Sequence, residues 1–465
     1  MLRISGSHLP PGIAASGETV VTEYDDVRIA VPDLNATHLD RVCSALLEAR
    51  HQLVTIPVAR VVRAVDMAAR RLLDPNEAER HHVLRSLHAI SGFSEAMAGH
   101  VLDRIAQDWR TPALEQLLTD ELGGHDALES FAHTSEGRRV RAVAPPLGLH
   151  VLSGNVPGIG VTSIVRALLV RSAVLAKSAA GEPALTPAFA RLLAQADPEV
   201  GACVAVTYWR GGETSIEDAV LERVGLVVHY GNDQAIAALR ARAPARVRFI
   251  EHGPHISFAL IDASGAGASL EHAARDLARA TALFDQQGCV SPQLAFVIGS
   301  RAQARHIAGA TAAALDDLQT ELPRGRLSPA EAAAIRELRT RAEFDAIGGG
   351  STELWCPPHL HFTVILSADD RFEGSCLNRT LLIKNVPDLT TLISRIEPFG
   401  SLLQTVGIAG FHADSMIRAA AALADAGVTR VTAIADMPWP PPGWHHDGRG
   451  PLRELIRWVD LEPRA

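Results

Sequence analysis

The hydrophobic pattern of the chain changes near residue 147. Between residues 35 and 135, apolar side chains recur at intervals of three and four positions, a spacing that predicts amphipathic helices. After residue 147, short apolar runs alternate with amphipathic segments, which is typical of strands separated by helices. We therefore expect a helical segment over 35–135 followed by α/β structure.

Five short apolar runs are candidates for buried strands. They lie at residues 147–152, 173–177, 202–208, 226–230 and 246–250. Helices are expected between them, near 160–171, from Thr186, near 215–222 and over 233–242. Buried strands that alternate with helices predict a doubly wound parallel sheet. Such a sheet binds ligands at the carboxyl ends of its strands, where turn-like clusters occur at 153–158, 177–178, 209–212 and 229–232.

The remainder of the chain predicts a second α/β unit. Strands are expected at 258–261, 294–298, 362–366, 381–386 and 431–434. Helices are expected at 270–287, 302–318, 328–346 and 415–426, the third opened by the capping box Ser328-Pro-Ala-Glu331. An alternating segment near 136–148 predicts an exposed arm, and the run 455–459 fits either an edge strand or a final helix.

Composition narrows the class of protein. The 465 residues are 47% apolar and 21% charged, which excludes a disordered or fibrous chain. A net charge of −9 argues against a nucleic-acid partner, because no basic excess exists to neutralise phosphates. The most apolar stretch, 161–176, contains Arg166 and Arg171 and therefore predicts no membrane span. Without a targeting segment at its start, the chain is expected to be cytoplasmic.

Among the five cysteines, Cys289 is the candidate nucleophile. Five thiols in a chain of this length are too few for a disulfide scaffold and are expected to be reduced. Cys289 follows a helix end in the polar turn 284–293, where it can be reached and where backbone N–H groups favour a thiolate. Cys43 and Cys203 lie in apolar patterns and are expected to be buried.

Glu251 is the candidate acid or base. It follows the fifth predicted strand in Phe249-Ile-Glu-His-Gly-Pro-His, and a carboxylate between apolar strands needs a partner or a function. A general base and a capping or salt-bridged glutamate fit this position equally well.

Two groups of histidines, His359-Leu-His361 and His445-His446-Asp447, have residue types that bind metals. A His-x-His pair in a strand and a loop pair far along the chain are more typical of surface positions, so no metal is expected. His446-Asp-Gly is expected to form a turn that docks the C-terminal tail.

The order of these motifs resembles the aldehyde dehydrogenase superfamily. The matching motifs are Asn155-Val-Pro, Val174-Leu-Ala-Lys177, His229-Tyr-Gly-Asn232, Glu251-His-Gly-Pro-His, Gln287-Gly-Cys289 and Glu397-Pro-Phe-Gly400. More narrowly, the chain resembles the acyl-CoA reductases of bacterial luminescence (LuxC-type). This likeness rests on Gly154-Asn-Val-Pro157, Gly253-Pro-His-Ile-Ser257, Asp285 to Gln293, Leu377-Asn-Arg379 and His446-Asp-Gly448.

The resemblance implies a role for each matched residue. Cys289 attacks an acyl thioester and holds the acyl group, which hydride from a nicotinamide then reduces to an aldehyde. Asn155 and the backbone N–H of Cys289 bind the developing oxyanion. The nicotinamide cofactor is expected to contact Lys177, Ser178, Gly231, Asn232, Glu397 and Phe399.

Two departures from the superfamily pattern bear on the reaction. Ala180 stands where members that prefer NAD carry a glutamate; this favours NADPH, although Glu182 is close. A thioester reductase also needs no hydrolytic water. Glu251 is then left to activate Cys289, to assist proton transfer or to do nothing essential, and His252 or His255 could share that work.

The resemblance predicts an aldehyde dehydrogenase-like α/β fold. We expect a doubly wound cofactor-binding domain with a helical N-terminal part over 1–250, and a catalytic thiol domain over 251–435. The arm at 136–148 and the tail at 436–465 are expected to pair between subunits of a homodimer or tetramer.

The expected reaction is NADPH-dependent reduction of an acyl-CoA or acyl-carrier thioester, with an acyltransferase or carrier protein as a possible partner. The alternatives are NAD(P)-dependent aldehyde oxidation with Glu251 as the base, and a catalytically silent scaffold that binds an acyl carrier or transferase.

Overall fold

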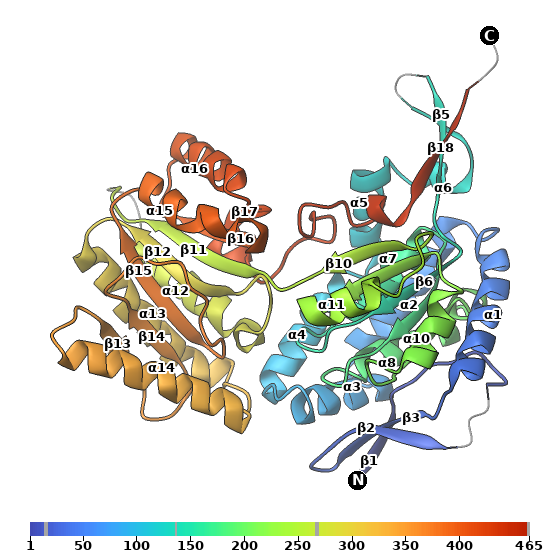
Figure 1. The fold of residues 1–465 in the computed structure, drawn as a ribbon, viewed down its shortest axis with the longest axis horizontal. Coiled ribbons are helices and arrows are strands. Elements are labelled where there is room, and N and C mark those ends of the chain that lie inside the picture. Colours follow the sequence, from blue (N-terminus) through green and yellow to red (C-terminus); the bar gives the residue numbers. More distant parts are fainter. Residues whose placement is uncertain (14–16, 135–136, 266–268, 463–465) are drawn as a thin grey trace. The chain divides into compact units, whose positions relative to one another are not determined.

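A computed structural model describes residues 1–13, 17–134, 137–265 and 269–462 (Figure 1). The chain divides into two compact units. Unit 1 comprises Met1–Ser91, Ala98–Gly253 and Pro441–Ala465, and unit 2 comprises Gly92–Met97 and Pro254–Pro440. Each unit is described by itself. The predicted assignment of cofactor binding to residues 1–250 and of catalysis to 251–435 stays a prediction.

The helical segment expected over 35–135 is confirmed as far as residue 129. Its helices are α1 (Ala36–Leu53), α2 (Val58–Leu73), α3 (Ala78–Ala89), α4 (Glu95–Gln107), α5 (Thr111–Leu122) and α6 (Asp126–Glu129). In α2, Val58, Val61, Val65 and Leu72 are buried on one face while Arg63 and Arg70 are exposed. This burial follows the spacing of three and four that predicted the helix.

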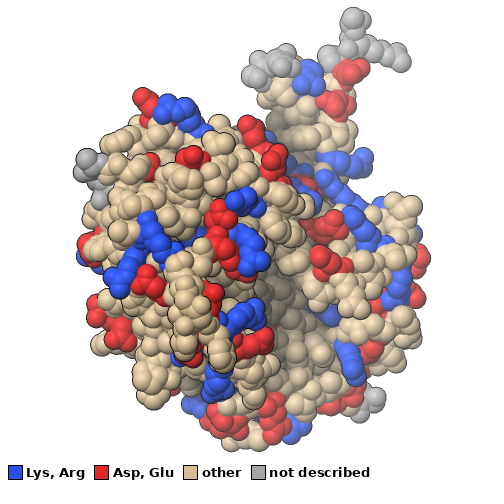
Figure 2. Space-filling view, turned by 60° about the vertical axis from the view of Figure 1, so that its left-hand side comes forward, with Lys and Arg blue, Asp and Glu red and all other residues tan. Residues whose placement is uncertain are grey.

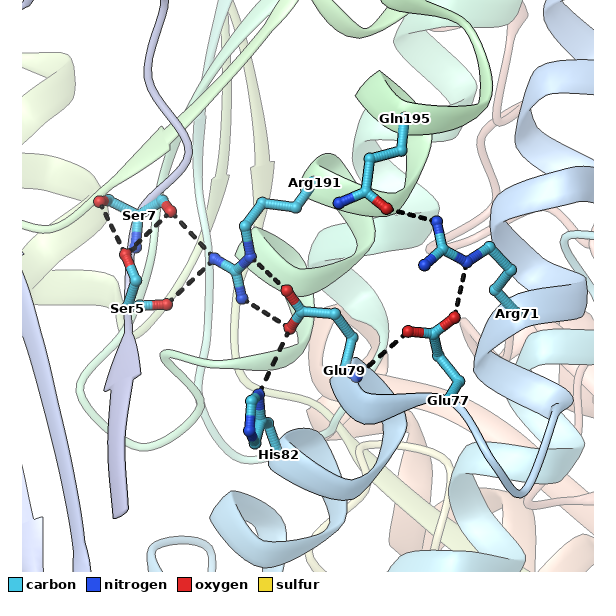
Figure 3. Close-up of polar contacts among 8 residues, drawn as sticks. All are labelled: Ser5, Ser7, Arg71, Glu77, Glu79, His82, Arg191 and Gln195. Carbon is cyan, nitrogen blue, oxygen red and sulfur yellow. Dashed lines mark hydrogen bonds and ion pairs between the residues drawn. The ribbon is translucent and has the colours of Figure 1, made fainter. Parts of the chain in front are cut away.

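A sheet at the N-terminus was not predicted. It contains β1 (Leu2–Ser5), β2 (Glu18–Tyr24) and β3 (Val27–Pro32) in the order β1-β3-β2. Figure 3 shows how Arg191 of helix α8 (Leu185–Ala196) ties this segment to the rest of unit 1. Its guanidinium donates to the carbonyl oxygens of Ser5 and Ser7 at 3.2 and 3.0 Å and pairs with Glu79 of α3 at 2.6 Å.

The first α/β part of unit 1 is the predicted doubly wound sheet. Five parallel strands, β6 (Leu147–Val151), β7 (Ala173–Lys177), β8 (Val204–Thr207), β9 (Leu226–Tyr230) and β10 (Arg248–His252), lie in the order β10-β9-β6-β7-β8. The helices between them are α7 (Ile159–Leu169), α8, α9 (Pro198–Gly201), α10 (Thr214–Leu221) and α11 (Asp233–Arg240). All residues of β6, β8 and β9 are buried, as expected for a sheet covered on both faces.

Unit 2 contains a seven-stranded sheet in the order β13-β14-β15-β12-β11-β16-β17. Its strands are β11 (Ile256–Asp262), β12 (Pro292–Ile298), β13 (Glu353–Trp355), β14 (Thr363–Leu366), β15 (Thr380–Val386), β16 (Leu403–Ala409) and β17 (Arg430–Ala433). Its helices include α12 (Leu270–Ala282), α13 (Arg301–Glu321), α14 (Pro329–Ile347), α15 (Leu389–Ile396) and α16 (Ala413–Asp425). Of these elements, β13, α15 and β16 were not predicted. The capping box at Ser328 and Glu331 is confirmed.

A small sheet joins the predicted arm to the tail. Strands β4 (Ala132–His133), β5 (Arg139–Val143) and β18 (Arg457–Leu461) lie in the order β18-β5-β4, with β18 antiparallel to β5. The last apolar run is therefore an edge strand and not a helix. Residue 136, the first of the predicted arm, lies outside the described residues. Pairing of this sheet between subunits stays a prediction.

The surface carries charges of both signs. Figure 2 shows acidic and basic side chains interspersed over the face of the molecule toward the viewer. No helix among the described residues is long and apolar enough to span a membrane.

Candidate functional site

Cys289 lies in a turn between a short 3-10 helix and a strand of unit 2. The 3-10 helix η1 (Leu283–Gln286) ends three residues before it, and β12 begins three residues after it. Cys289 is half-buried, and its role as the nucleophile stays a prediction. The hydroxyl of Ser257 donates to the carbonyl oxygen of Cys289 at 2.6 Å and accepts from the backbone N–H of Thr405 at 3.2 Å. This fully buried serine therefore fixes the backbone at Cys289.

The residues before Cys289 have an uncommon backbone. Phe284, Asp285 and Gln286 have φ angles of 56°, 48° and 67°, in the left-handed region that side chains other than glycine seldom occupy. A second left-handed run, Leu377 to Arg379, has φ angles of 60°, 58° and 58°. Such strain costs about 1–3 kcal/mol per residue and persists only where surrounding contacts enforce it.

The two left-handed runs are bound to each other by a group that we call the loop brace, made of Asp285, Gln286, Asn378 and Arg379. Asp285 Oδ1 and Arg379 Nε form an ion pair at 2.7 Å, with the arginine side chain 0% and the aspartate side chain 8% exposed. The Gln286 amide donates to the carbonyl oxygens of Pro292 and Thr380 and accepts from Thr380 N–H at 2.8 Å. These contacts hold the turn that carries Cys289.

The loop brace continues toward the thiol through Gln287. The Gln287 amide donates to Asn378 Oδ1 at 3.1 Å, and the same oxygen accepts from Arg324 Nη2 at 3.1 Å. Gly325 N–H donates to Asp285 Oδ2 at 3.1 Å. Asp285 and Arg379 both stand in sequence motifs, but their contact and the residues that complete it depend on the folded structure.

Arg430, at the start of β17, is a positive charge that the sequence did not reveal at this site. Burial lowers the pKa of Arg430 to about 10. The negative charges of Asp436 and Cys289 act in the opposite direction and raise this pKa. Its guanidinium also donates to the carbonyl oxygens of Met437 and Asp436 at 2.9 and 2.8 Å. A cation held in this way favours the thiolate of Cys289, which is the nucleophilic form.

The predicted burial of Cys43 and Cys203 is confirmed. Cys43 and Cys203 are buried, and burial raises the pKa of each thiol to about 12. Burial also raises the pKa of Cys356 and of Cys376. These four thiols are therefore poor nucleophiles at neutral pH.

In unit 1, the predicted cofactor residues gather at the carboxyl edge of the sheet. Lys177 ends β7, its ammonium lying 5.6 Å from the Trp209 ring centroid and 6.0 Å from that of Tyr208. The pKa of Lys177 is lowered by burial, an effect opposed by Glu217 and Glu213. Ser178 is buried, and its hydroxyl has no hydrogen-bond partner among the described residues.

The remaining unit 1 residues follow β6 and β9. Asn155 lies exposed in the turn between β6 and α7. Gly231 follows β9, and its N–H donates to the carbonyl oxygen of His252 at 3.2 Å. Asn232 caps α11 by accepting from Ala235 N–H at 2.9 Å. The sheet topology therefore brings these turns to one edge, where an open α/β sheet binds ligands.

Glu251 lies near the end of β10 and is paired with a cation. Its carboxylate lies 3.1 Å from a guanidinium nitrogen of Arg240 in α11, and the glutamate side chain is 34% exposed. The structure thus has the salt bridge that was one of the two interpretations of this residue. A role for Glu251 in catalysis stays a prediction.

His252 belongs to a stacked column in unit 1. Its ring stacks on Tyr230 at 4.6 Å and on His446 at 4.3 Å between centroids, and His446 stacks on Trp444 at 4.7 Å. His252 Nδ1 lies 2.7 Å from Asp447 Oδ2. This contact confirms that His446-Asp-Gly docks the tail. His252, His446 and Asp447 could also serve as metal ligands, since their ligand atoms lie within 4.8 Å of one another.

Glu397 and Phe399 lie in unit 2, in the 3-10 helix η2 (Glu397–Leu402) before β16. The Glu397 side chain is exposed. The Phe399 ring lies 5.0 Å from that of Phe372 and packs against the core. Their predicted contacts with the cofactor stay a prediction.

Comparison with solved structures establishes the fold class. The chain superposes on a putative methylmalonate-semialdehyde dehydrogenase from Sinorhizobium meliloti with a TM-score of 0.77 and 14% identity, covering 100% of this chain and 99% of that one. It superposes on an NADP-dependent glyceraldehyde-3-phosphate dehydrogenase from Bacillus halodurans with a TM-score of 0.74 and 16% identity, covering 96% and 95%. The predicted aldehyde dehydrogenase-like α/β fold is confirmed.

Sequence comparison is more specific. The chain is 24% identical over 466 aligned positions to the long-chain acyl-protein thioester reductase of Vibrio harveyi, covering 98% of this chain and 93% of the relative. It is 26% identical to the protein of the same description from Aliivibrio fischeri, covering 82% and 78%. The family model described as acyl-CoA reductase (LuxC) matches residues 53–458. The chain belongs to the acyl-CoA reductase (LuxC) family.

Proposed function

We propose that this chain reduces an acyl thioester to an aldehyde, with Cys289 as the acyl acceptor and NADPH as the electron donor. The observation that carries the proposal is a half-buried thiol in a braced turn, in a chain that matches an acyl-CoA reductase family over residues 53–458. The donor is an acyl-CoA or an acyl group held on a carrier protein or acyltransferase, as the acyl-protein substrates named for the relatives suggest.

The first half of the reaction is a transfer between sulfur atoms. The Cys289 thiolate attacks the thioester carbonyl carbon, a new carbon–sulfur bond forms, and the bond to the carrier sulfur breaks. The carrier leaves as a thiolate and takes a proton from solvent or a nearby acid. Asn155 and the backbone N–H of Cys289 are proposed to bind the oxyanion, because donors fixed in advance stabilise charge that appears only during the reaction.

The second half needs two electrons, which the reduced nicotinamide supplies as a hydride when it is bound. Once the hydride has been added to the acyl carbon, the bond from that carbon to the Cys289 sulfur breaks, the aldehyde leaves and the electron pair of the broken bond stays on the sulfur. Cys289 is restored as a thiolate, which the charge of Arg430 favours. The loop brace keeps the sulfur in one place through both halves, which is the chain's contribution to orientation.

The carboxyl edge of the unit 1 sheet fits a phosphorylated dinucleotide. The buried hydroxyl of Ser178, without a partner among the described residues, can donate to a ligand there. Lys177 supplies a cation. Ala180 offers no carboxylate, and Glu182 is turned away because its Oε1 accepts from the backbone N–H groups of Ala184 and Leu185 at 3.1 and 2.6 Å. No acid at these two positions then repels a 2′-phosphate, which supports NADPH.

The competing activity is oxidation of an aldehyde to an acid, which requires Glu251 to activate water. The Glu251 carboxylate is instead paired with the Arg240 guanidinium at 3.1 Å, which favours the salt-bridge interpretation over the general base. Glu251→Gln is therefore expected to change aldehyde formation from the thioester less than threefold. A thousandfold loss of aldehyde formation in this variant would mean that Glu251 takes part in proton transfer.

The proposal is tested with the purified full-length chain. Acyl-CoA and NADPH are expected to give aldehyde, whereas aldehyde and NADP are expected to give little acid, with NADPH absorbance and product analysis as the two readouts. Cys289→Ala is expected to remove turnover in both directions, and Cys376→Ala is the matched control. Turnover that persists in Cys289→Ala would mean that another residue is the nucleophile.

A further inference from the structure

Unit 2 contains a cavity of about 580 Å³ whose lining residues have no role in the reaction proposed above. It is formed by the connection after α13, one face of α14 and the segment before β14. Its charged and histidine lining residues are Arg324, Arg336, Arg339, Glu343, His359 and His361. This volume lies in the usual range for small-molecule sites, about 300–1,000 Å³.

The lining is cationic in a chain whose net charge is −9. Arg339 is committed to the protein, because its guanidinium donates to Thr363 Oγ1 and to the carbonyl oxygens of Pro357, His359 and Phe362. Arg336 is different: it is exposed and makes no hydrogen bond or ion pair to any residue in the described part of the chain. Arg341, five residues later on α14, is paired with Glu337 at 2.9 Å.

Arg324 adds a second cation with an unused donor. Its Nη2 donates to Asn378, but its Nε is buried and lacks a partner within the described ranges. Burial lowers the pKa of Arg324 to about 10, so the group stays charged at neutral pH. The pKa of His361 is lowered by burial first and then by the neighbouring charges of His359, Arg324 and Arg379. The cavity thus has a positive potential that an anion would relieve.

Hydrogen bonds link this cavity to the turn at residues 284–293 that carries Cys289, which we call the nucleophile turn. Asn378 Oδ1 accepts from Arg324 Nη2 and from Gln287 Nε2, both at 3.1 Å, and Gln287 stands two residues before Cys289. Gly325, which also lines the cavity, donates to Asp285 of the loop brace at 3.1 Å. A ligand held by Arg324 is therefore bound next to the segment that positions the sulfur.

We infer that the cavity binds the phosphate of the 4′-phosphopantetheine arm of the thioester donor, through Arg324 and Arg336. The inference rests on the proposed function, since it names the part of the donor that unit 2 recognises. The arm carries the acyl thioester at one end and a phosphate at the other, and arginine is well suited to bind phosphate oxygens. CoA and a carrier-protein prosthetic group share this chemistry, and either can supply it.

The test compares two donors that differ by one phosphate: acyl-4′-phosphopantetheine and acyl-pantetheine with the same acyl chain. The quantity measured is the ratio of their kcat/KM values for aldehyde formation by the full-length chain. Loss of one charged phosphate contact is expected to lower this ratio about tenfold in Arg336→Gln. The ratio is expected to stay at the wild-type value in Arg341→Gln, the matched control on the same helix.

Acyl-CoA and acyl-carrier protein then identify the source of the phosphate. A higher KM in Arg336→Gln for acyl-CoA alone assigns the site to CoA, and a higher KM for the carrier alone assigns it to the carrier. A ratio that is unchanged in Arg336→Gln, or that falls equally in Arg341→Gln, overturns the inference. Failure of every donor to acylate Cys289 instead overturns the proposed function, so the two failures are distinguishable.

Discussion

Replacing Arg379 with methionine breaks a buried ion pair of the turn that carries Cys289. The guanidinium donates to Asp285 at 2.7 Å and to the carbonyl oxygen of Leu322 at 3.0 Å. Methionine fills much of the volume but leaves the Asp285 carboxylate buried without its partner. Breaking one side of a buried ion pair costs about 3–5 kcal/mol. The left-handed run at Phe284 to Gln286 also loses a contact that enforces it.

The effect should be local to the turn and visible in two readouts. Hydrogen exchange measured by mass spectrometry over residues 283–299 is expected to report an opening free energy lower by about 3–5 kcal/mol. Alkylation of Cys289 at neutral pH and acylation by acyl-CoA are expected to change together, since both depend on the same turn. The double variant Asp285→Asn, Arg379→Met is expected to lose less than the sum of the two single variants.

The surface pair Arg305–Glu353 supplies the control. These side chains are 65% and 32% exposed, and Arg305→Met should change stability by less than about 1 kcal/mol. If Arg379→Met were no more destabilising than Arg305→Met, or if Asp285→Asn and Arg379→Met were additive, the loop brace would not be what holds the turn.

Three further predictions concern the charged groups of the two units. Lys177→Met is expected to raise KM for NADPH about tenfold with a smaller effect on kcat, and an unchanged KM would remove Lys177 from the cofactor site. Arg430→Gln removes the cation that favours the thiolate, so Cys289 alkylation by iodoacetamide should slow at pH 7 and reach the wild-type rate at high pH; an unshifted pH profile would contradict this. Burial raises the pKa of Glu182 from 4.5 to about 7, so the folded chain binds this proton more tightly than the unfolded chain. Stability then falls as pH rises through this window, and Glu182→Gln is expected to abolish a total fall of roughly 3 kcal/mol between pH 4 and pH 8, measured by urea titrations.

The strands that were predicted from the sequence lie mostly in short, largely apolar runs. Strand β7 and strand β9 were predicted with the bounds that the structure has. Strand β16 was missed because Gln404 and Thr405, although buried, interrupt its apolar pattern. Its Gly407 packs so closely on Met437 that a Cβ would lie 2.2 Å from the sulfur, which is a reason for glycine that only the tertiary structure shows.

The candidate site shows the same difference between what local sequence predicts and what only the fold determines. Cys289 and Glu251 stand in local motifs, so the sequence could identify them as candidates. The partners that decide their chemistry come from elsewhere in the chain. Arg379 lies 94 positions from Asp285, and Arg430, whose charge acts on Cys289, stands in strand β17. Glu251 meets Arg240, 11 positions away, through the packing of α11 on β10. Contacts of this kind depend on the folded sheet and leave no periodic signal in the sequence.

The most direct test of the central claim is a single-turnover measurement on Cys289. The chain is incubated with acyl-CoA without cofactor, and peptide mass spectrometry locates the acyl group; NADPH is then added and aldehyde is quantified. We predict one acyl group per chain on Cys289, and its replacement by an equal amount of aldehyde after NADPH is added. An acyl group on another residue, no adduct, or an acyl-enzyme that yields acid instead of aldehyde would contradict the account.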